Sequence, residues 1–409
     1  AEYRGGGLCM HINADAKNCQ ILQIYNCHFL NNSAQSDGGG LFIGSDPEQY
    51  LVMSNCKILH IYNCHISNNN AKLGGGLCIY IYVSNWQTLH IYNCHISTNS
   101  AEEDGGGLYV SVEQPMPNCL LLHIYNCHIL HNSGEVGSGL KTYIDGYMVM
   151  SNCKLFRNTA TRHGGGIHNG YSPSLFYNCT LSENFATVEG GGMLHEDNNS
   201  TIMMNCTIKQ NRARSGGGLY SKRSHKLIII SSSLSMNVAS TKGGAIKIEN
   251  GQNRCWIFMN FCLFTKNIAE HQGAVFFLVA VKGIFVGNTQ ITQNTVESMT
   301  SSLIFVQGHW VIFNNLNLKN MPPVIILTKL LFSIATLNHV HFGCSRHTHL
   351  SEDFKSEFVG GPFYLSYRCG KCHSNQYILH SEQWLVTKEV SNLFINQWQY
   401  ICKECATHG

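Results

Sequence analysis

Hydrophobic and polar residues alternate with a period of two along short stretches of the chain. Residues 89 to 92, with the sequence Leu-His-Ile-Tyr, show the pattern, and it predicts a strand with one face buried and the other exposed. The buried set continues at Cys94 and Ile96, so the phase changes at Asn93 and a corner is expected there. No copy contains a long stretch with the helical period of 3.6 residues. The chain is therefore predicted to be all-β.

A glycine cluster followed by an aliphatic residue recurs through the chain. The copies begin at Gly5, Gly38, Gly74, Gly105, Gly137, Gly164, Gly190, Gly216 and Gly243. Glycine adopts positive φ at little cost, so such clusters break helices and suit sharp turns. Each cluster is therefore expected to form a turn between two strands.

A second motif, Cys-x-(Ile/Leu/Phe)-x-x-Asn, precedes the clusters. Its copies begin at Cys27, Cys64, Cys94, Cys127, Cys153, Cys179, Cys206 and Cys262, and Ser233 and Thr289 take the cysteine place in two more. Short strands repeated at this spacing predict a right-handed parallel β-helix, a solenoid in which each repeat forms one coil. A sandwich or propeller is the alternative, but a propeller blade needs about 40 residues and four strands, more than a copy supplies.

The repeat resembles that of the polymorphic outer-membrane proteins of chlamydiae, which pairs Gly-Gly-Ala-Ile with Phe-x-x-Asn. Residues 243–246 and 264–267 match this pair almost literally. Similar repeats occur in large cysteine-rich extracellular proteins of sponges and protists. The resemblance covers residues 1–300 and implies a surface β-helix used for adhesion or as a spacer.

The motif decays towards the end of the chain. We predict regular β-helix repeats over residues 1–300, degenerate capping coils over 301–343, and a small cysteine-rich C-terminal module over 344–409. Terminal repeats should be atypical, because an open coil end is an unpaired strand edge.

The C-terminal module has five cysteines. They are Cys344, Cys369, Cys372, Cys402 and Cys405, and four of them form two Cys-x-x-Cys pairs. Four thiolates at such spacing could hold zinc. In an exported protein the same residues are disulfide partners, and this is the interpretation we favour.

The repeated cysteines have two interpretations. Stacked inward, they form a ladder of buried thiols that act as small hydrophobic groups, which we favour; bridges between coils are the alternative. The chain has 19 cysteines in all, and such abundance suggests an oxidising compartment.

Charge excludes several function classes. Charged residues make up 12% of the chain and the net charge is +3, too little to indicate binding to nucleic acid. No apolar run of 18 residues occurs, so no transmembrane segment is predicted in this sequence. The chain opens inside a repeat at Gly5, and we expect either further repeats before it or association with other copies as a homo-oligomer.

Five Asn-x-(Ser/Thr) sequons are candidate glycosylation sites. They are Asn31, Asn178, Asn198, Asn199 and Asn205. Asn198 and Asn199 lie in a polar loop and are the preferred candidates. Asn178 and Asn205 precede ladder cysteines at a corner, which we expect to enclose them.

No catalytic residue and no cofactor are predicted. Glycoside hydrolysis needs two carboxylates about 5 to 9.5 Å apart, yet the chain has only 24 acidic residues, mostly in turns before the glycine clusters. A lyase would need several Asp around calcium with a nearby base, and no such set is visible. We therefore do not expect an enzyme.

Outward-facing tyrosines and histidines should align from coil to coil and form a surface ladder. Its members are His60, Tyr62, His65, His90, Tyr92, His95, His123, Tyr125 and His128. Such rows could stack on sugars, bind a partner, or hold zinc or copper. The alternative is that they merely suit exposed strands and were copied by duplication.

Three functions remain open from the sequence. The leading one is an extracellular or cell-surface structural or adhesive protein, non-catalytic and self-assembling. The second is a carbohydrate-binding or polysaccharide-degrading β-helix similar to pectate lyases, with glycans or extracellular matrix as partners. The third is a metal-binding matrix protein that uses the histidine rows.

Overall fold

The computed structural model describes most of the repeat region. Described residues are 3–11, 21–44, 58–82, 88–113, 120–144, 146–197, 200–250, 255–297 and 302–319, followed by short strands between 324 and 404.

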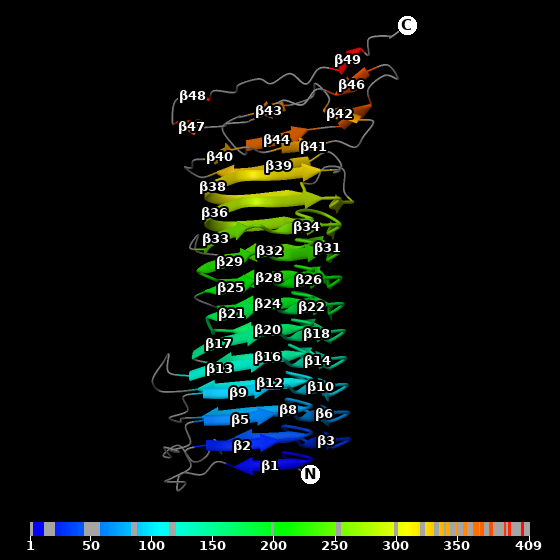
Figure 1. The fold of residues 1–409 in the computed structure, drawn as a ribbon, viewed down its shortest axis with the longest axis vertical. Helices are drawn as coiled ribbons and strands as arrows, with labels where there is room; N and C mark the ends of the chain where they lie inside the picture. The colour runs from blue at the N-terminus through cyan, green and yellow to red at the C-terminus, as the bar shows by residue number, and fades with distance from the viewer. Residues whose placement is uncertain are drawn as a thin grey trace.

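The described strands form a parallel β-solenoid, so the predicted fold class is confirmed. Coils stack along one axis from the N-terminal coil upwards (Figure 1). Every pairing between the strands from β1 to β38 is parallel, in one sheet of 34 strands and another of nine. No helix occurs among the described residues.

We call the strand that carries the outward row beginning with the tyrosines the first strand of each coil. These strands are β2 (Ile21–Tyr25), β5 (Ile58–Tyr62), β9 (Thr88–Tyr92), β13 (Leu120–Tyr125), β17 (Gly146–Ser151), β21 (Ser174–Tyr177), β25 (Thr201–Met204), β29 (Lys226–Ile230) and β33 (Cys255–Asn260). Each pairs with the next in register, as where His60 lies beside His90.

A short second strand follows each corner. These strands are β3 (His28–Leu30), β6 (His65–Ser67), β10 (His95–Ser97), β14 (His128–Leu130), β18 (Lys154–Phe156), β22 (Thr180–Ser182), β26 (Thr207–Lys209), β30 (Ser233–Ser235) and β34 (Leu263–Thr265).

The third strands form the nine-stranded sheet. They are β7 (Asn70–Ala71), β11 (Ser100–Ala101), β15 (Ser133–Val136), β19 (Thr159–His163), β23 (Phe185–Ala186), β27 (Arg212–Ser215), β31 (Val238–Lys242), β35 (Ile268–Ala269) and β37 (Thr295–Val296).

The fourth strands come after the glycine clusters. They are β1 (Leu8–His11), β4 (Leu41–Gly44), β8 (Leu77–Tyr82), β12 (Leu108–Glu113), β16 (Leu140–Ile144), β20 (Ile167–Gly170), β24 (Met193–Glu196), β28 (Leu219–Lys222) and β32 (Ile246–Glu249). Near the C-terminal end of the stack, β36 (Phe276–Thr292) and β38 (Ile304–Lys319) are longer strands, and each takes the place of several short strands of a coil.

Asparagines make the corners. Asn93 has a φ of 54°, in the left-handed region that asparagine tolerates better than most residues, and this turns the chain from β9 into β10. The predicted phase change at Asn93 is therefore confirmed. The second asparagine of each copy is buried and hydrogen-bonded to its neighbour: Asn99 Nδ2 donates to Asn132 Oδ1 at 3.0 Å.

The first glycine of each cluster makes a sharp elbow. Gly216 has a φ of 64°, and a Cβ added there would lie 2.6 Å from the Cβ of Tyr220. The outward side chain of the following strand thus packs directly into the bend. Tyr220 is only 1% exposed, although it is not part of the main hydrophobic core.

Leucine, isoleucine and cysteine fill the interior in aligned rows. Cys94 and Cys127 are buried as predicted, and both are free thiols. The prediction that Ser233 replaces a ladder cysteine is wrong. Ser233 pairs with Thr207, whereas Ser232 Oγ accepts a hydrogen bond from the Cys206 backbone N–H at 3.0 Å and therefore occupies the cysteine place.

Parallel stacking changes to antiparallel pairing in the C-terminal region. The strands β39 (Val324–Leu330), β40 (Ala335–Asn338) and β41 (His341–Gly343) still pair in parallel with β38. In contrast, β44 (Phe363–Tyr367) pairs antiparallel with β39 and with β43 (Lys355–Glu357). The boundaries drawn at 300 and 343 stay predictions.

Short antiparallel strands contain part of the cysteine-rich segment. They are β42 (Thr348–Leu350) with β45 (Cys369–Lys371), β46 (Gln376–Ile378) with β49 (Cys402–Glu404), and β47 (Lys388–Glu389) with β48 (Asn392–Leu393). Cys344, Cys372 and Cys405 lie outside the described residues. The predicted disulfides therefore stay predictions.

Candidate functional site

The structure brings the predicted tyrosine and histidine ladder together. Parallel register places Tyr62, Tyr92 and Tyr125 side by side on the outer surface of the first strands. The same strands align His60, His90 and His123, and the second strands align His65, His95 and His128. Because the buried neighbours Leu89 and Ile91 alternate with these residues, the period of two directs the ladder outward.

The ladder rings lie close enough to interact. Tyr62 and Tyr92 stack with their ring centroids 4.9 Å apart and their planes at 4°. His60 and His90 meet edge to face at 5.0 Å. Burial, together with neighbouring histidines, lowers the pKa of His90 below its ordinary value. The lowered pKa favours the neutral imidazole of His90.

The histidine rows do not assemble a metal site. Across the described part of the chain, no group of three or more His, Cys, Asp or Glu side chains is placed to hold a metal ion. The geometry gives no support to the metal-binding alternative.

Both first-strand rows continue beyond the ladder, which sequence reasoning missed. The continued histidine row is apolar, whereas the continued tyrosine row mixes apolar residues with Ser151 and Asn260. The histidine row is prolonged by Val149, Leu175, Ile202, Ile228, Phe258 and Phe285. The tyrosine row is prolonged by Ser151, Tyr177, Met204 and Ile230. We call these two rows, from Gln23 and Tyr25 onwards, the uncharged face.

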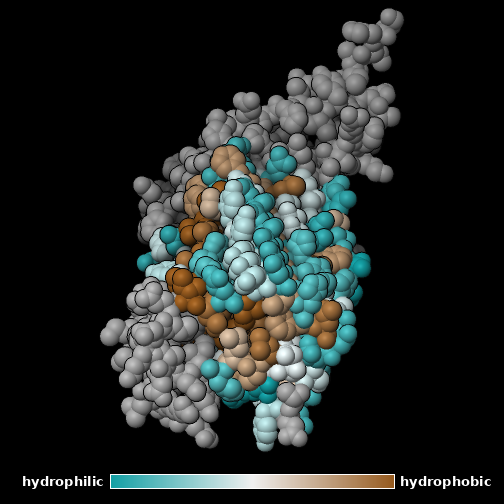
Figure 2. Space-filling model, turned by 60° about the horizontal axis from the view of Figure 1, so that its bottom comes forward, coloured by the Kyte–Doolittle hydropathy of each residue, from teal (hydrophilic) through white to brown (hydrophobic). Residues whose placement is uncertain are grey.

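The uncharged face has no Asp, Glu, Lys or Arg side chain in either row between residues 23 and 287. Several of its residues are well exposed, including Tyr125, Tyr177 and Phe258. The space-filling view of one side of the molecule shows hydrophobic side chains gathered in contiguous areas beside hydrophilic columns (Figure 2). Its partly exposed apolar side chains, such as Leu175, Ile202 and Ile228, lie next to one another, and neighbouring apolar side chains on a surface mark an interaction site in soluble proteins.

A signal for the continued rows was present in the sequence. The histidine row always lies four residues before the ladder cysteine, as His90 does before Cys94 and Ile202 before Cys206. Applying that offset to every copy of the motif would have identified the apolar residues that continue the histidine row.

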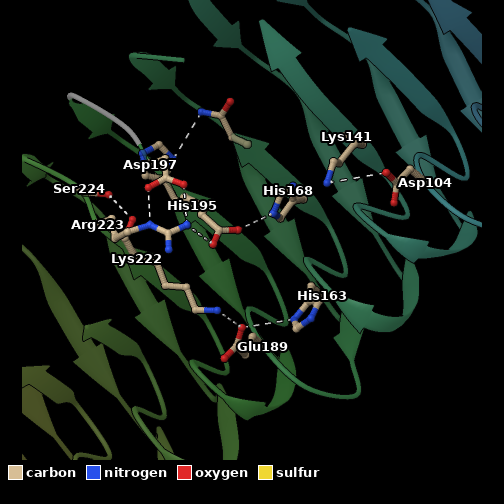
Figure 3. A network of polar contacts seen from close by, with 12 residues as sticks. Asp104, Lys141, His163, His168, Glu189, His195, Asp197, Lys222, Arg223 and Ser224 are labelled. Atoms are coloured by element: carbon tan, nitrogen blue, oxygen red, sulfur yellow. Dashed lines mark hydrogen bonds and ion pairs between the residues drawn. The ribbon is translucent and has the colours of Figure 1, made fainter. Parts of the chain in front are cut away.

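A second cluster lies on the outer side of the fourth strands, inside the glycine elbows. We call it the polar strip. It comprises Lys141, His168, Glu196 and Lys222 on the fourth strands, together with Asp104, His163 and Glu189, which come just before the glycine clusters (Figure 3). Sequence reasoning did not predict it. Its contacts join residues from different coils, and no repeated motif in the sequence predicts them.

Ion pairs cross the elbow from one strand to the next. Lys222 Nζ donates to Glu189 Oε2 at 2.7 Å, and His163 Nδ1 lies 3.3 Å from the same oxygen. Burial alone would raise the pKa of Glu189, but its contacts with His163 and Lys222 outweigh burial and lower it. The strip therefore holds Glu189 as a carboxylate.

Glu196 is fixed from two sides. Its Oε1 accepts a hydrogen bond from Arg223 Nη2 at 2.8 Å, and its Oε2 lies 3.5 Å from His168 Nε2. The contact with His168 is the main reason that the pKa of Glu196 falls to about 2. Burial lowers the pKa of His168 to about 4, so at neutral pH a neutral imidazole faces an ionised carboxylate.

The predicted glycosylation sites fall on different surfaces. Asn31, Asn178 and Asn205 are exposed, so the expectation that a corner encloses Asn178 and Asn205 is wrong. The left-handed corner turns these side chains outward, where Asn178 Nδ2 donates to Asn152 Oδ1 at 2.7 Å. Asn198 and Asn199 lie outside the described residues.

Two further findings concern the chain as a whole. No helix that could cross a membrane occurs in the part of the chain that the structure describes. Neither a protein-family model nor a curated protein matches this sequence.

Proposed function

We propose that this chain is a structural, adhesive β-solenoid that associates side by side with further copies of itself through the uncharged face. The observation that carries the proposal is the unbroken alignment of uncharged side chains along that face, from Gln23 and Tyr25 to Phe285. The aliphatic and aromatic side chains of this face are costly to leave in water.

A second copy suits the uncharged face for electrostatic reasons. Two such faces bring no like charges together, so their association costs no repulsion and little desolvation of ions. The regular spacing of coils also lets rows of side chains from two solenoids interdigitate at many positions. A self-complementary patch of this kind is the basis of a two-fold symmetric interface.

The repeat motif supports a location outside the cell. The Gly-Gly-Ala-Ile and Phe-x-x-Asn elements are similar to those of polymorphic outer-membrane protein repeats, which implies a surface β-helix for adhesion. Exposure of Asn31, Asn178 and Asn205 suits glycosylation in an exported protein. We propose an extracellular or cell-surface protein that is non-catalytic and needs no cofactor.

Paired lysine substitutions on adjacent coils test the proposal. Ile202 and Ile228 are neighbours on the uncharged face, so Ile202→Lys with Ile228→Lys places two charges in its middle. The matched control is Ser100→Lys with Ser133→Lys, a neighbouring outward pair on β11 and β15 that lies outside every sequon. Because both variants place lysines on paired strands, any general effect of added charge is the same.

Sedimentation equilibrium gives the readout. We expect the wild type and the serine control to associate at micromolar concentration, and the isoleucine variant to be monomeric with an unchanged β-type circular dichroism spectrum. A wild-type monomer, or association retained in the isoleucine variant, would contradict the proposal.

A further inference from the structure

Three histidines of the uncharged face lie side by side on successive coils. Parallel register aligns His60, His90 and His123, and neighbouring ring centroids in this row are 5.0 and 5.7 Å apart. All three residues are partly exposed, so protons from the solvent can reach their rings. Because the strand ladder fixes the spacing of the coils, a charge on one ring acts directly on the next.

Among the described residues, no charged side chain borders this histidine row. The residues that flank it on the same strands are apolar or carry only a hydroxyl group: Ile58, Thr88 and Leu121 on one side, and Tyr62, Tyr92 and Tyr125 on the other. Gln23 and Val149 extend the row on the neighbouring coils. A protonated imidazole in this row would therefore have no compensating charge beside it.

The polar groups near the row do not compensate a positive charge either. His123 Nε2 lies 3.4 Å from Ser151 Oγ, which is a neutral group. Across the corner, the second strands carry further histidines, which would add charge of the same sign in acid: His65, His95 and His128. In the part of the chain that the structure describes, the histidines within 4.0 Å of a carboxylate oxygen all lie elsewhere: His163, His168 and His271.

Mild acid is the range in which histidine changes its charge. Its ordinary pKa is about 6.5. Burial, and then the neighbouring His60 and His123, lower the pKa of His90, while burial lowers the pKa of His123. Both shifts favour the neutral imidazole at neutral pH and move protonation to more acidic solution.

We propose that this histidine row makes side-by-side association sensitive to acid: protonation between about pH 7 and pH 5 charges the uncharged face and separates the copies. The inference rests on the association proposed above and concerns the regulation of that same surface. Water surrounds an imidazolium on the free chain, whereas association would bury it. Acid therefore shifts the equilibrium towards the free chain.

Either orientation of a second copy leads to the same result. Copies that lie parallel place one histidine row against the other, so protonated rings repel each other. Copies that lie antiparallel place the histidines against the apolar continuation of the row, which includes Ile202 and Ile228. There an imidazolium loses its hydration without gaining a partner. The switch therefore does not depend on the direction in which the second copy binds.

Sedimentation equilibrium of the full chain at pH 7.5 and at pH 5.5 is the test. We expect the dissociation constant of wild-type self-association to rise about hundredfold or more between the two pH values, because several protons per dimer are linked to dissociation. The circular dichroism spectrum should stay of β type at both pH values, which shows that the separated chains are folded.

Glutamine variants locate the effect, because glutamine has no charge that changes with pH. Gln23 takes the place of the row on β2, so His60→Gln, His90→Gln and His123→Gln together suit the fold. This triple variant should associate at both pH values, with a dissociation constant that changes less than about fivefold. The matched control replaces three exposed histidines outside the face by glutamine, and it should dissociate in acid as the wild type does: His11, His225 and His271.

Several results would overturn the switch. Wild-type association that is unchanged at pH 5.5 would refute it and leave the proposed function intact. A triple variant that dissociates in acid as the wild type does would show that other groups respond, and loss of the β-type spectrum at pH 5.5 would show that acid acts by unfolding. A wild type that is monomeric at pH 7.5 would refute the proposed function and the switch with it, so the two failures are distinguishable.

Discussion

Asn99 donates a side-chain hydrogen bond to Asn132 on the next coil, and Asn132 repeats the contact with Asn158. Each amide also donates to a backbone carbonyl, as Asn132 Nδ2 does to the Ile96 carbonyl oxygen at 3.1 Å. The ladder therefore satisfies buried polar groups that the corner would otherwise leave unpaired.

Replacing Asn132 by Ala should destabilise the protein by about 3 kcal/mol. The substitution removes the hydrogen-bond partner of one Asn99 side-chain N–H, of the Asn99 backbone N–H and of the Ile96 carbonyl oxygen in a buried corner. Urea unfolding measures the change. The exposed residue Glu102, changed to Ala, should cost less than about 0.5 kcal/mol; equal effects of both substitutions would show that the ladder is not what holds the corners.

Two glycines of one coil should respond oppositely to Ala. In Gly164→Ala the new Cβ would lie 2.6 Å from the Ile167 carbonyl oxygen at a φ of 63°, and we expect a loss of about 2 kcal/mol or more. Gly170→Ala meets no such contact and should leave the free energy of unfolding within about 0.5 kcal/mol of wild type. Thermal unfolding of both variants checks the pair. A large loss for Gly170→Ala would show that packing around this position requires glycine.

Stability should fall as the pH drops below about 6.5. Burial lowers the pKa of His195 to about 3, so in the folded protein the ring stays neutral while the unfolded chain binds a proton. The unfolded state is thus favoured progressively from pH 6.5 down to 3. Glu196, whose pKa is lowered, adds a loss that begins near pH 4.5, because its stabilising contribution disappears as it becomes protonated.

His195→Gln should flatten this pH dependence. Urea midpoints measured from pH 7 to pH 3 should decline less steeply in the variant, by an amount on the order of a few kcal/mol in unfolding free energy. The exposed His271, changed to Gln, is the control and should follow the wild type. A His195→Gln curve parallel to the wild type would contradict the assigned burial of the neutral ring.

The cysteine ladder should tolerate replacement of a thiol by a hydroxyl group but not by a charged group. Cys127 Sγ donates to the Tyr125 carbonyl oxygen at 3.3 Å, and Ser232 Oγ makes the same type of contact with the Ile230 carbonyl oxygen at 2.8 Å. Cys127→Ser should therefore cost only about 1 kcal/mol, whereas Cys127→Asp should prevent folding because it buries an unpaired carboxylate. Circular dichroism and urea unfolding distinguish these outcomes. Loss of structure in Cys127→Ser would contradict the interchangeability of thiol and hydroxyl.

The fold was predictable because its causes are local and repeated. The glycine before each fourth strand and the asparagine at each corner specify a backbone conformation wherever they occur, so Gly164 or Asn93 can be interpreted without its neighbours. Ser233 was misplaced within a run of serines: counted back from Leu234 and Asn237, the cysteine place of the motif falls on Ser232.

The polar strip was not predictable, because its contacts are neither local in the sequence nor repeated. His168 and Glu196 come from different copies, and only the parallel register of β20 and β24 places their side chains in contact. The phase of each strand and the direction of each elbow must be known before such pairs can be seen. In contrast, the apolar residues that continue the histidine row could have been predicted from the sequence, since their offset from each ladder cysteine is constant.

Photo-cross-linking at Ile202 tests the central claim most directly, because it reports which surfaces touch. A benzophenone amino acid placed there, in the middle of the uncharged face, should give covalent dimers on irradiation, with the cross-linked peptides from β21, β25 and β29 of the second copy. The same group at the exposed Ser133 on β15 should give few or none. Dimers joined elsewhere than the uncharged face, or none from Ile202, would contradict association through that face.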